Sequence, residues 1–302
     1  MAVIEVQSIS KNFGSLTAVD QLSFSVQQGE VFGFLGQNGS GKSTTIRMLL
    51  SLIHPSSGSI QLFGLPLKEH RNELLEKVGA IIERPDLYPY LTAREHLKLF
   101  SQVRKKQITT ADINATLEKV GLSHRSSDKV QTFSLGMKQR LGIGIALVHN
   151  PELIILDEPT NGLDPQGIAD IRHLIQYLAK EEGKTVFVSS HLLSEIEQVA
   201  SQILIIHQGK KVAAGDTDKL LDPNKTIVHV TTLNDEAALL AIHASSFAGN
   251  LLPRKDGIYF MLPKHEIPML HKAMVLADIA LLNVESKNSL EDYFLQVTSN
   301  SN

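Results

Sequence analysis

The sequence contains no cysteine, which excludes disulfide bonds, thiolate metal sites and cysteine nucleophiles. No apolar run approaches the ~20 residues that a membrane-spanning helix needs. The first residues also lack the basic start and apolar core of a secretory signal peptide. A protein of the cytoplasm is therefore expected, where the absence of cysteine fits the reducing conditions.

An excess of positive charge is also missing. The 29 Lys and Arg residues are balanced by 32 Asp and Glu residues, which gives a formal net charge of −3. Nucleic-acid binding needs a broad positive field, so no nucleic-acid partner is expected. The 12 histidines show no metal-ligand spacing. A chain of 302 residues with 42% hydrophobic content is long enough for one large globular domain and a small one.

The feature that stands out is the stretch Gly36-Gln37-Asn38-Gly39-Ser40-Gly41-Lys42-Ser43-Thr44. It lies between the apolar runs Val31–Leu35 and Ile46–Leu50, which predicts a strand, a glycine loop and a helix. The glycines allow positive φ and bring backbone N–H groups to phosphate oxygens at a helix N-terminus. Lys42 adds a charge for the outer phosphates, and the Ser43 hydroxyl is placed to ligate Mg²⁺. This stretch predicts a site for a nucleoside triphosphate.

A second motif begins with the apolar run Leu153–Leu156, which ends in Asp157 and Glu158. An entirely apolar strand is expected in the middle of a parallel sheet that is covered on both faces. Asp157 at its tip could reach Mg²⁺ through water, whereas Glu158 points elsewhere and could polarise an attacking water. His191 follows the β-rich run Thr185–Ser189 and would face the ligand crevice of such a sheet. Considered alone, Asp157 and Glu158 could simply form a solvated acidic turn, and His191 could be a structural histidine.

The remaining pattern predicts the domain organisation. Residues 1–218 form a nucleotide-binding domain, with an antiparallel sheet in its first thirty residues and a helical subdomain at about 84–150. Residues 225–302 form a small α+β domain of order β-α-β-β-α-β, with a trailing helix at 290–297, which suggests a ferredoxin-like sandwich. No catalytic constellation occurs in it, so packing, regulation or docking is its expected role.

The run Phe133–Leu141 resembles the signature of the ATP-binding-cassette ATPases, whose usual form is Leu-Ser-Gly-Gly-Gln, and keeps its serine and a glycine as Ser134 and Gly136. The downstream run Asp157–Pro165 matches that family more closely, and the motifs together span residues 1 to about 216. The resemblance implies an α/β phosphate-loop fold with a mixed, largely parallel sheet, an antiparallel β subdomain and a helical subdomain. It also implies two copies paired head to tail, each ATP lying between one copy's phosphate loop and the signature of the other.

The resemblance further implies roles for single residues. Glu158 would be the general base, His191 would contact the γ-phosphate, and Asp164 would lie at the seam between two copies. From the residues alone, Phe13 in the polar loop Lys11–Ser15 either fastens that loop to the sheet or stacks on a purine. The resemblance favours stacking on adenine.

One position departs from the family pattern. A glutamine usually follows the strand that corresponds to Val78–Ile82, and here the position is Glu83. This glutamate and the run Leu87–Leu97 resemble a subset of exporters for lantibiotic immunity and bacitracin resistance. We expect Glu83 beside the γ-phosphate and Mg²⁺, with its charge neutralised by the metal or by Arg84. Alternatively, Glu83 only replaces a hydrogen-bonding amide.

These features predict the ATP-hydrolysing subunit of a multi-component exporter. It would lie on the inner face of the cell membrane through a separate integral-membrane permease, and an antimicrobial peptide or similar amphiphile is the favoured cargo. Translation and repair proteins of the same family are rivals, but they carry a second cassette with a basic linker, or a long coiled coil, and neither occurs here. A regulator or gate in which slow hydrolysis only resets binding is a third possibility.

Overall fold

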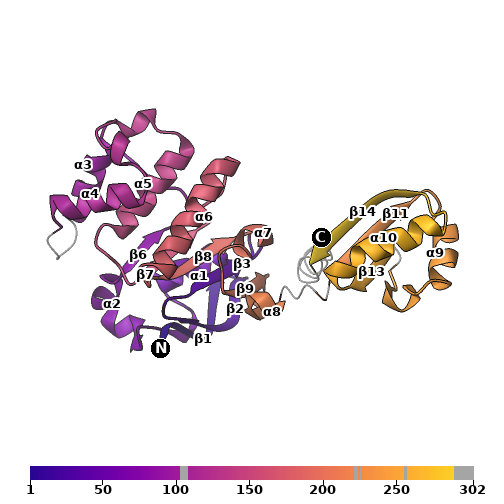
Figure 1. Cartoon of the computed structure of the whole chain (residues 1–302). Coiled ribbons are helices and arrows are strands. Elements are labelled where there is room, and N and C mark those ends of the chain that lie inside the picture. Colours follow the sequence, from indigo (N-terminus) through magenta and orange to yellow (C-terminus); the bar gives the residue numbers. More distant parts are fainter. Residues whose placement is uncertain (103–107, 221–223, 225, 255–256, 289–302) are drawn as a thin grey trace. The chain divides into compact units, whose positions relative to one another are not determined.

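The computed structural model describes residues 1–102, 108–220, 224, 226–254 and 257–288. The chain divides into two compact units, Met1–Asp216 and Thr217–Asn302 (Figure 1). Each unit has a hydrophobic core of its own. No helix among the described residues is both long and apolar enough to cross a membrane.

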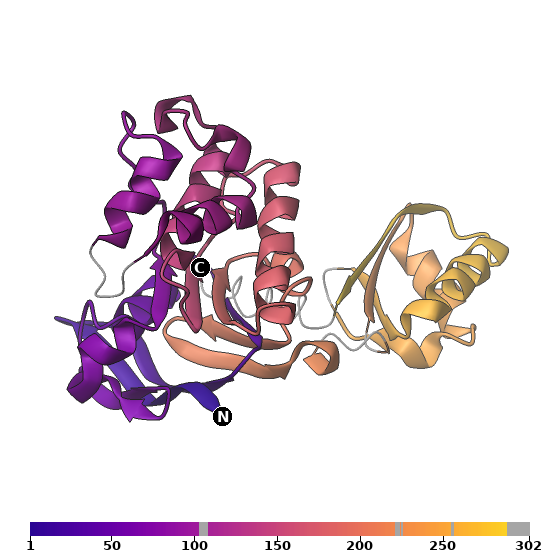
Figure 2. The same ribbon diagram turned by 60° about the vertical axis from the view of Figure 1, so that its left-hand side comes forward.

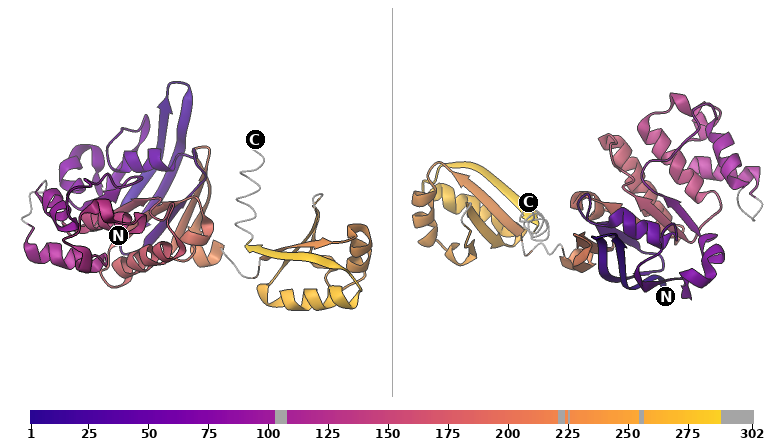
Figure 3. Two further views of the ribbon diagram at one scale, coloured as in Figure 1. Left: turned by 90° about the horizontal axis from the view of Figure 1, so that it is seen from above. Right: turned by 180° about the vertical axis from the view of Figure 1, so that it is seen from behind.

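The first unit contains two sheets. Its strands are β1 (Ala2–Phe13), β2 (Leu16–Gln27), β3 (Val31–Leu35), β4 (Ser57–Leu62), β5 (Leu65–Pro66), β6 (Val78–Ile81), β7 (Leu153–Asp157), β8 (Thr185–Ser190), β9 (Gln202–His207) and β10 (Lys210–Asp216). One sheet has the order β10-β9-β3-β8-β7-β6, in which β9 and β10 pair antiparallel and the other neighbours pair parallel. The other has the antiparallel order β2-β1-β4-β5, and its long β1–β2 pair is visible in Figure 3.

The middle strands of the parallel sheet are entirely buried, as predicted for the apolar run Leu153–Leu156. Every residue of β3, β7 and β8 is buried. On one face, Phe24 of β2 packs against Phe32 and Phe187, with ring centroids 5.6 and 6.1 Å apart, so the antiparallel sheet covers the parallel one. Aromatic packing of this kind fixes the strands whose carboxyl ends carry the predicted motifs.

The helices of the first unit connect its strands, and part of them form a separate block. In this unit they are α1 (Lys42–Leu49), α2 (Leu67–Leu75), α3 (Ala93–Ser101), α4 (Thr110–Lys119), α5 (Leu135–Leu147), α6 (Pro165–Lys180) and α7 (Leu193–Ile196). The helices α3, α4 and α5 gather at one end of the unit, away from the β1–β2 pair (Figures 1 and 2). A Cβ at Gly79 of β6 would lie 2.1 Å from the Ala146 carbonyl oxygen. Glycine there allows α5 to lie directly against the strand that leads to Glu83.

The second unit has the predicted β-α-β-β-α-β order. After the short helix α8 (Thr217–Leu220) come β11 (Thr226–Thr232), α9 (Asp235–His243), β12 (Leu251–Leu252), β13 (Ile258–Leu262), α10 (Ile267–Leu276) and β14 (Leu281–Asn288). The strands form an antiparallel sheet of order β12-β13-β11-β14, and both α9 and α10 lie on one face of it (Figure 2). Phe260, Ile242 and Met274 meet in the core between them. The helix predicted at 290–297 lies outside the described residues.

The capping box at the start of α3 is formed as predicted. The Thr92 hydroxyl accepts a hydrogen bond from the Glu95 N–H at 3.2 Å, and the Glu95 carboxylate accepts one from the Thr92 N–H at 2.8 Å. The backbone hydrogen bond from Thr92, and then that from its hydroxyl, lower the pKa of Glu95. The stabilisation is therefore present above the pKa of Glu95 in the unfolded chain and is lost as the pH falls through the lowered value.

Replacing Thr92 with alanine should destabilise the first unit by about 1 kcal/mol near neutral pH, because an N-cap acceptor is lost. Urea unfolding followed by circular dichroism measures the change. Thr110→Ala, at an exposed position inside the first turn of α4, is the control and should leave the midpoint unchanged. Equal midpoints for Thr92→Ala and the wild type at neutral pH would contradict the prediction.

Candidate nucleotide site

A cavity of about 670 Å³ lies beside the phosphate loop at the carboxyl ends of the parallel strands. This volume falls within the roughly 300–1,000 Å³ usual for small-molecule sites. The residues that the sequence predicts for nucleotide or metal and that line the cavity are Phe13, Asn38, Gly39, Gly41, Lys42, Ser43, Thr44, Glu83, Asp157 and Glu158. The wall is completed by Arg84, which was expected beside Glu83, and by residues that were not predicted for the site: Leu16, Ala18, Gln37, Gln139 and Asn161.

The phosphate loop joins β3 to α1 as predicted, but its glycines are required for two different reasons. Gly39 and Gly41 have positive φ, at 80° and 105°. Gly36 has no positive φ, contrary to the expectation, and is required because a Cβ there would lie 2.7 Å from the Ile206 carbonyl oxygen. No side chain caps the N-terminus of α1. The N–H groups of its first turn therefore stay available to an anion at the positive end of the helix dipole.

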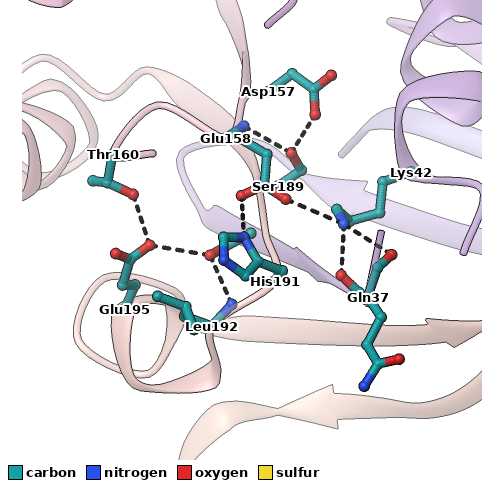
Figure 4. Close-up of polar contacts among 11 residues, drawn as sticks. Gln37, Lys42, Asp157, Glu158, Thr160, Ser189, His191, Leu192 and Glu195 are labelled. Carbon is teal, nitrogen blue, oxygen red and sulfur yellow. Dashed lines mark hydrogen bonds and ion pairs between the residues drawn. The ribbon is translucent and has the colours of Figure 1, made fainter. Parts of the chain in front are cut away.

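Lys42 is 5% exposed and its charge is satisfied inside the protein. Its Nζ donates to the carbonyl oxygens of Gly36 at 2.5 Å and of Gln37 at 3.2 Å. The same Nζ lies 3.1 Å from Oε1 of Glu158 (Figure 4). A buried ammonium is tolerated only when paired in this way, and phosphate oxygens could replace the carboxylate as its partner.

The two carboxylates at the end of β7 have separate surroundings (Figure 4). Asp157 is 1% exposed, and its Oδ1 accepts a hydrogen bond of 2.6 Å from the Ser189 hydroxyl. Glu158 has a φ of 49°, which turns its side chain away from that of Asp157. Its Oε2 lies 2.7 Å from Nδ1 of His191. Because a carboxylate only accepts hydrogen bonds, the His191 Nδ1 is the donor, and Nε2 is left for another partner.

One oxygen at this edge of the sheet could serve a cation. Oδ2 of Asp157 is buried and has no hydrogen-bond partner, and Ser43 lines the same cavity. Across the described part of the chain, no group of three or more His, Asp or Glu residues could hold a metal by itself. This donor set suits Mg²⁺, which is commonly held by one or two side chains together with substrate phosphates and water.

Glu83 lies on the cavity wall, and its charge partner there is Arg47. Its Oε1 accepts from the Arg47 guanidinium at 2.8 Å, whereas Arg84, which was expected as a partner alongside Mg²⁺, lines the cavity. Both side chains of the Arg47–Glu83 pair are largely solvated, at 44% and 64% exposure, so its stabilising effect is small. Glu83 also has a φ of 60°, in the left-handed region. The sequence signal that was missed is the position of Arg47 on the helix after the phosphate loop.

Phe13 occupies a different local structure from the predicted loop. It is the last residue of β1 and pairs with Leu16 of β2, so only Gly14 and Ser15 separate the two strands. Its ring is 49% exposed, lines the cavity, and has Nζ of Lys11 5.2 Å from its centroid. An exposed ring on a cavity wall is available for stacking on a base.

The signature residues lie at the starts of two helices, outside the cavity of their own chain. Ser134 caps α5, where its Oγ accepts from the Met137 N–H at 3.2 Å. Asp164 caps α6 in the same way, with its Oδ1 3.0 Å from the Gly167 nitrogen. Ser134, Gly136 and Asp164 are described by the structure, and none of them lines the chain's own cavity. The N-termini of α5 and α6 lie close together, since a Cβ at Gly136 would be 3.9 Å from the Gly167 Cα.

Comparisons with known proteins agree with this geometry. Residues 19–161 match the family model described as ABC transporter. The chain is 43% identical to the bacitracin transport ATP-binding protein BcrA of Bacillus licheniformis, over 98% of this chain and 97% of that protein. It is 40% identical to the lantibiotic transport ATP-binding protein SrtF of Streptococcus pyogenes, over 72% of this chain and 92% of that protein.

A solved structure supports the fold. The structure titled "Structure of ATP binding subunit of ABC transporter" superposes with a TM-score of 0.64 at 31% identity, covering 72% of this chain and 91% of that chain. The predicted phosphate-loop fold, with its largely parallel core sheet, antiparallel sheet and helical block, is confirmed.

Replacing Lys42 with alanine should weaken ATP binding at least about tenfold, because one charge-assisted contact to phosphate is lost. The same change leaves the Glu158 carboxylate without its buried cation. Isothermal titration calorimetry with MgATP measures the effect, and Lys68→Ala, at an exposed position of α2, is the control. Wild-type affinity in Lys42→Ala would show that this lysine does not contact the nucleotide.

Proposed function

The chain belongs to the ATP-binding-cassette family of transporter ATPases, and from this premise we propose that it powers the export of antimicrobial peptides or antibiotics of the bacitracin or lantibiotic kind. It binds and hydrolyses ATP, and the transport that this drives is carried out by a separate membrane permease. The strongest support is similarity over nearly the full length to a bacitracin transport ATP-binding protein. Glu83 and the signature of this chain also resemble that subset of exporters.

In this proposal Glu158 is the general base of hydrolysis. Its carboxylate lies 3.1 Å from Lys42 and 2.7 Å from His191, and these contacts support a joint role of the three side chains at the γ-phosphate. When phosphate oxygens take over Lys42, Oε1 of Glu158 is released to accept a proton from the attacking water. Because Nδ1 of His191 is bonded to Glu158, Nε2 is the ring nitrogen that would contact the γ-phosphate.

Mg²⁺ would be held by the Ser43 hydroxyl and, through water, by the unpaired Oδ2 of Asp157. When bound, it would neutralise the charge that develops on the β- and γ-phosphates. Glu83, at 64% side-chain exposure, would reach the same region after leaving Arg47. The remaining contacts come from the chain itself: the first N–H groups of α1 bind phosphate, and Phe13 stacks on adenine.

A second copy of the chain completes the site. Ser134 and Gly136 begin α5, an N-terminus that suits an anion, yet they lie outside the chain's own cavity. Two copies paired head to tail would bring this helix end to the partner's γ-phosphate and place Asp164 at the seam. Hydrolysis therefore depends on the dimer, in which ATP is held between a phosphate loop and the signature of the other copy.

The location and the second unit follow from the exporter role. The chain would lie in the cytoplasm against the inner face of the membrane, held there by its permease rather than by a span of its own. The nucleotide-binding domain would cover residues 1–218, with its helical subdomain at about 84–150. The α+β domain at 225–302 would serve packing, regulation or docking.

Replacing Glu158 with glutamine should abolish steady-state ATP hydrolysis, because an amide cannot accept the proton of water. ATP binding should persist, since the loop contacts remain, and a stable ATP-bound dimer should accumulate. Phosphate release and size-exclusion chromatography with ATP measure the two effects. The neighbouring Glu152→Gln, at an exposed position before β7, is the control. Normal turnover in Glu158→Gln would reject Glu158 as the base.

Deleting the gene should raise sensitivity to bacitracin or to a lantibiotic, and the wild-type chain, but not Lys42→Ala, should restore resistance.

A tagged chain purified from detergent-solubilised native membranes should carry an integral-membrane partner, identified by mass spectrometry. Untagged membranes are the control. Recovery of the chain without any integral-membrane protein would contradict the exporter proposal, and an unchanged sensitivity would contradict the proposed cargo.

A further inference from the structure

A carboxylate outside the nucleotide cavity joins the two segments that carry Glu158 and His191. Oε2 of Glu195, on the short helix α7, accepts a hydrogen bond of 2.6 Å from the Thr160 hydroxyl. The same oxygen accepts one of 3.1 Å from the Ser190 hydroxyl (Figure 4). Thr160 stands two residues after Glu158, and Ser190 stands immediately before His191. One oxygen atom thus links both segments.

The link continues into the backbone around His191. The Ser190 Oγ, which donates to Glu195, accepts a hydrogen bond of 3.0 Å from the Leu192 N–H. The hydroxyl therefore bridges the carboxylate and the peptide that follows the histidine. Ser190 is 1% exposed, and the bonds it makes to Glu195 and to Leu192 are partly buried. Hydrogen bonds to an ionised acceptor are shorter and stronger than those between neutral groups, which fits the 2.6 Å contact with Thr160.

The helix that carries Glu195 is itself fixed. Its Leu193 and Ile196 are 6% and 1% exposed and pack into the first unit. A Cβ at Gly33 of β3 would lie 2.2 Å from Ile196, so the helix lies directly on the central strand. Glu195 therefore offers a stationary acceptor, whereas Glu158 and His191 both lie at strand ends. A fixed acceptor of this kind would keep the separation between Glu158 and His191 constant.

We propose that Glu195 is a positioning residue for ATP hydrolysis, which holds the Glu158 and His191 segments at the separation that their 2.7 Å contact requires. This inference rests on the proposed roles of Glu158 and His191. Glu195 does not line the cavity, so it acts through Thr160 and Ser190 rather than on the nucleotide. Its loss should therefore change the rate of the chemical step and leave the binding of ATP unchanged.

The test compares Glu195→Ala with Glu195→Gln in the full chain. Alanine removes the shared acceptor and should lower kcat about 10- to 100-fold, the loss expected when a catalytic group is displaced by about 1 Å. The KM and the Kd for ATP should stay at their wild-type values. Glutamine keeps one side-chain oxygen that can accept from both hydroxyls, so it should restore most of kcat. Thr160→Val removes one donor with little change of shape and should give an intermediate loss.

A spectroscopic reading separates positioning from general stability. The ring ¹⁵N resonances of His191, assigned with His191→Ala, report the hydrogen bond between Nδ1 and Glu158. They should shift in Glu195→Ala and Thr160→Val but not in Glu197→Ala, a carboxylate change just after the same short helix. A thermal unfolding midpoint close to that of the wild type would accompany the shift.

The outcomes distinguish this inference from the function on which it rests. If Glu158→Gln and His191→Ala retain turnover, the proposed site fails. If those variants lose turnover while Glu195→Ala keeps the wild-type kcat, only the positioning role is rejected. The positioning role is also rejected if Glu195→Ala and Glu195→Gln lose kcat equally and the His191 resonances do not shift.

Discussion

The arrangement of the site depends on one carboxylate. Glu158 lies between Lys42 and His191, and the three residues come from segments far apart in the sequence. The parallel sheet brings them together, because Leu35 of β3 is aligned with Ser190 of β8, and Asp157 of β7 with Ser189. All three strands thus end at one edge. Lys42 and Glu158, at 5% and 17% side-chain exposure, pair with each other because neither charge could remain unpaired there at low cost.

The same geometry underlies the proposal that the hydrolytic site is shared between two copies of the chain. The phosphate loop, Asp157 and Glu158 face one cavity, whereas Ser134 and Gly136 begin a helix that lies outside it. The close approach of Ala146 to Gly79 holds α5 directly against β6. In the proposed dimer, a second copy is the means by which both helix ends reach one triphosphate.

Local sequence patterns predicted the features that depend on residues close together in the sequence. The buried strand β7 follows from the apolar run Leu153–Leu156, and the capping box at Thr92 follows from hydrogen bonds three residues apart. The prediction that Phe13 lies in a loop was wrong. Phe13 belongs to a strand because β1 pairs with β2 up to Leu16, and the extent of this pairing could not be read from a polar, glycine-containing segment.

The sequence by itself determined that a phosphate loop, an acidic strand end and a histidine would meet at the edge of a parallel sheet, because strand, loop and helix signals are encoded within a few residues. Only the tertiary structure decided which charges pair. Arg47 rather than Arg84 holds Glu83, and Gly36 is required by the nearby Ile206 carbonyl rather than by its own φ. The link from Thr160 through Glu195 to Ser190 likewise depends on the packing of α7 against β3. Such contacts join residues remote in the chain, and their distances follow from packing that no local pattern specifies.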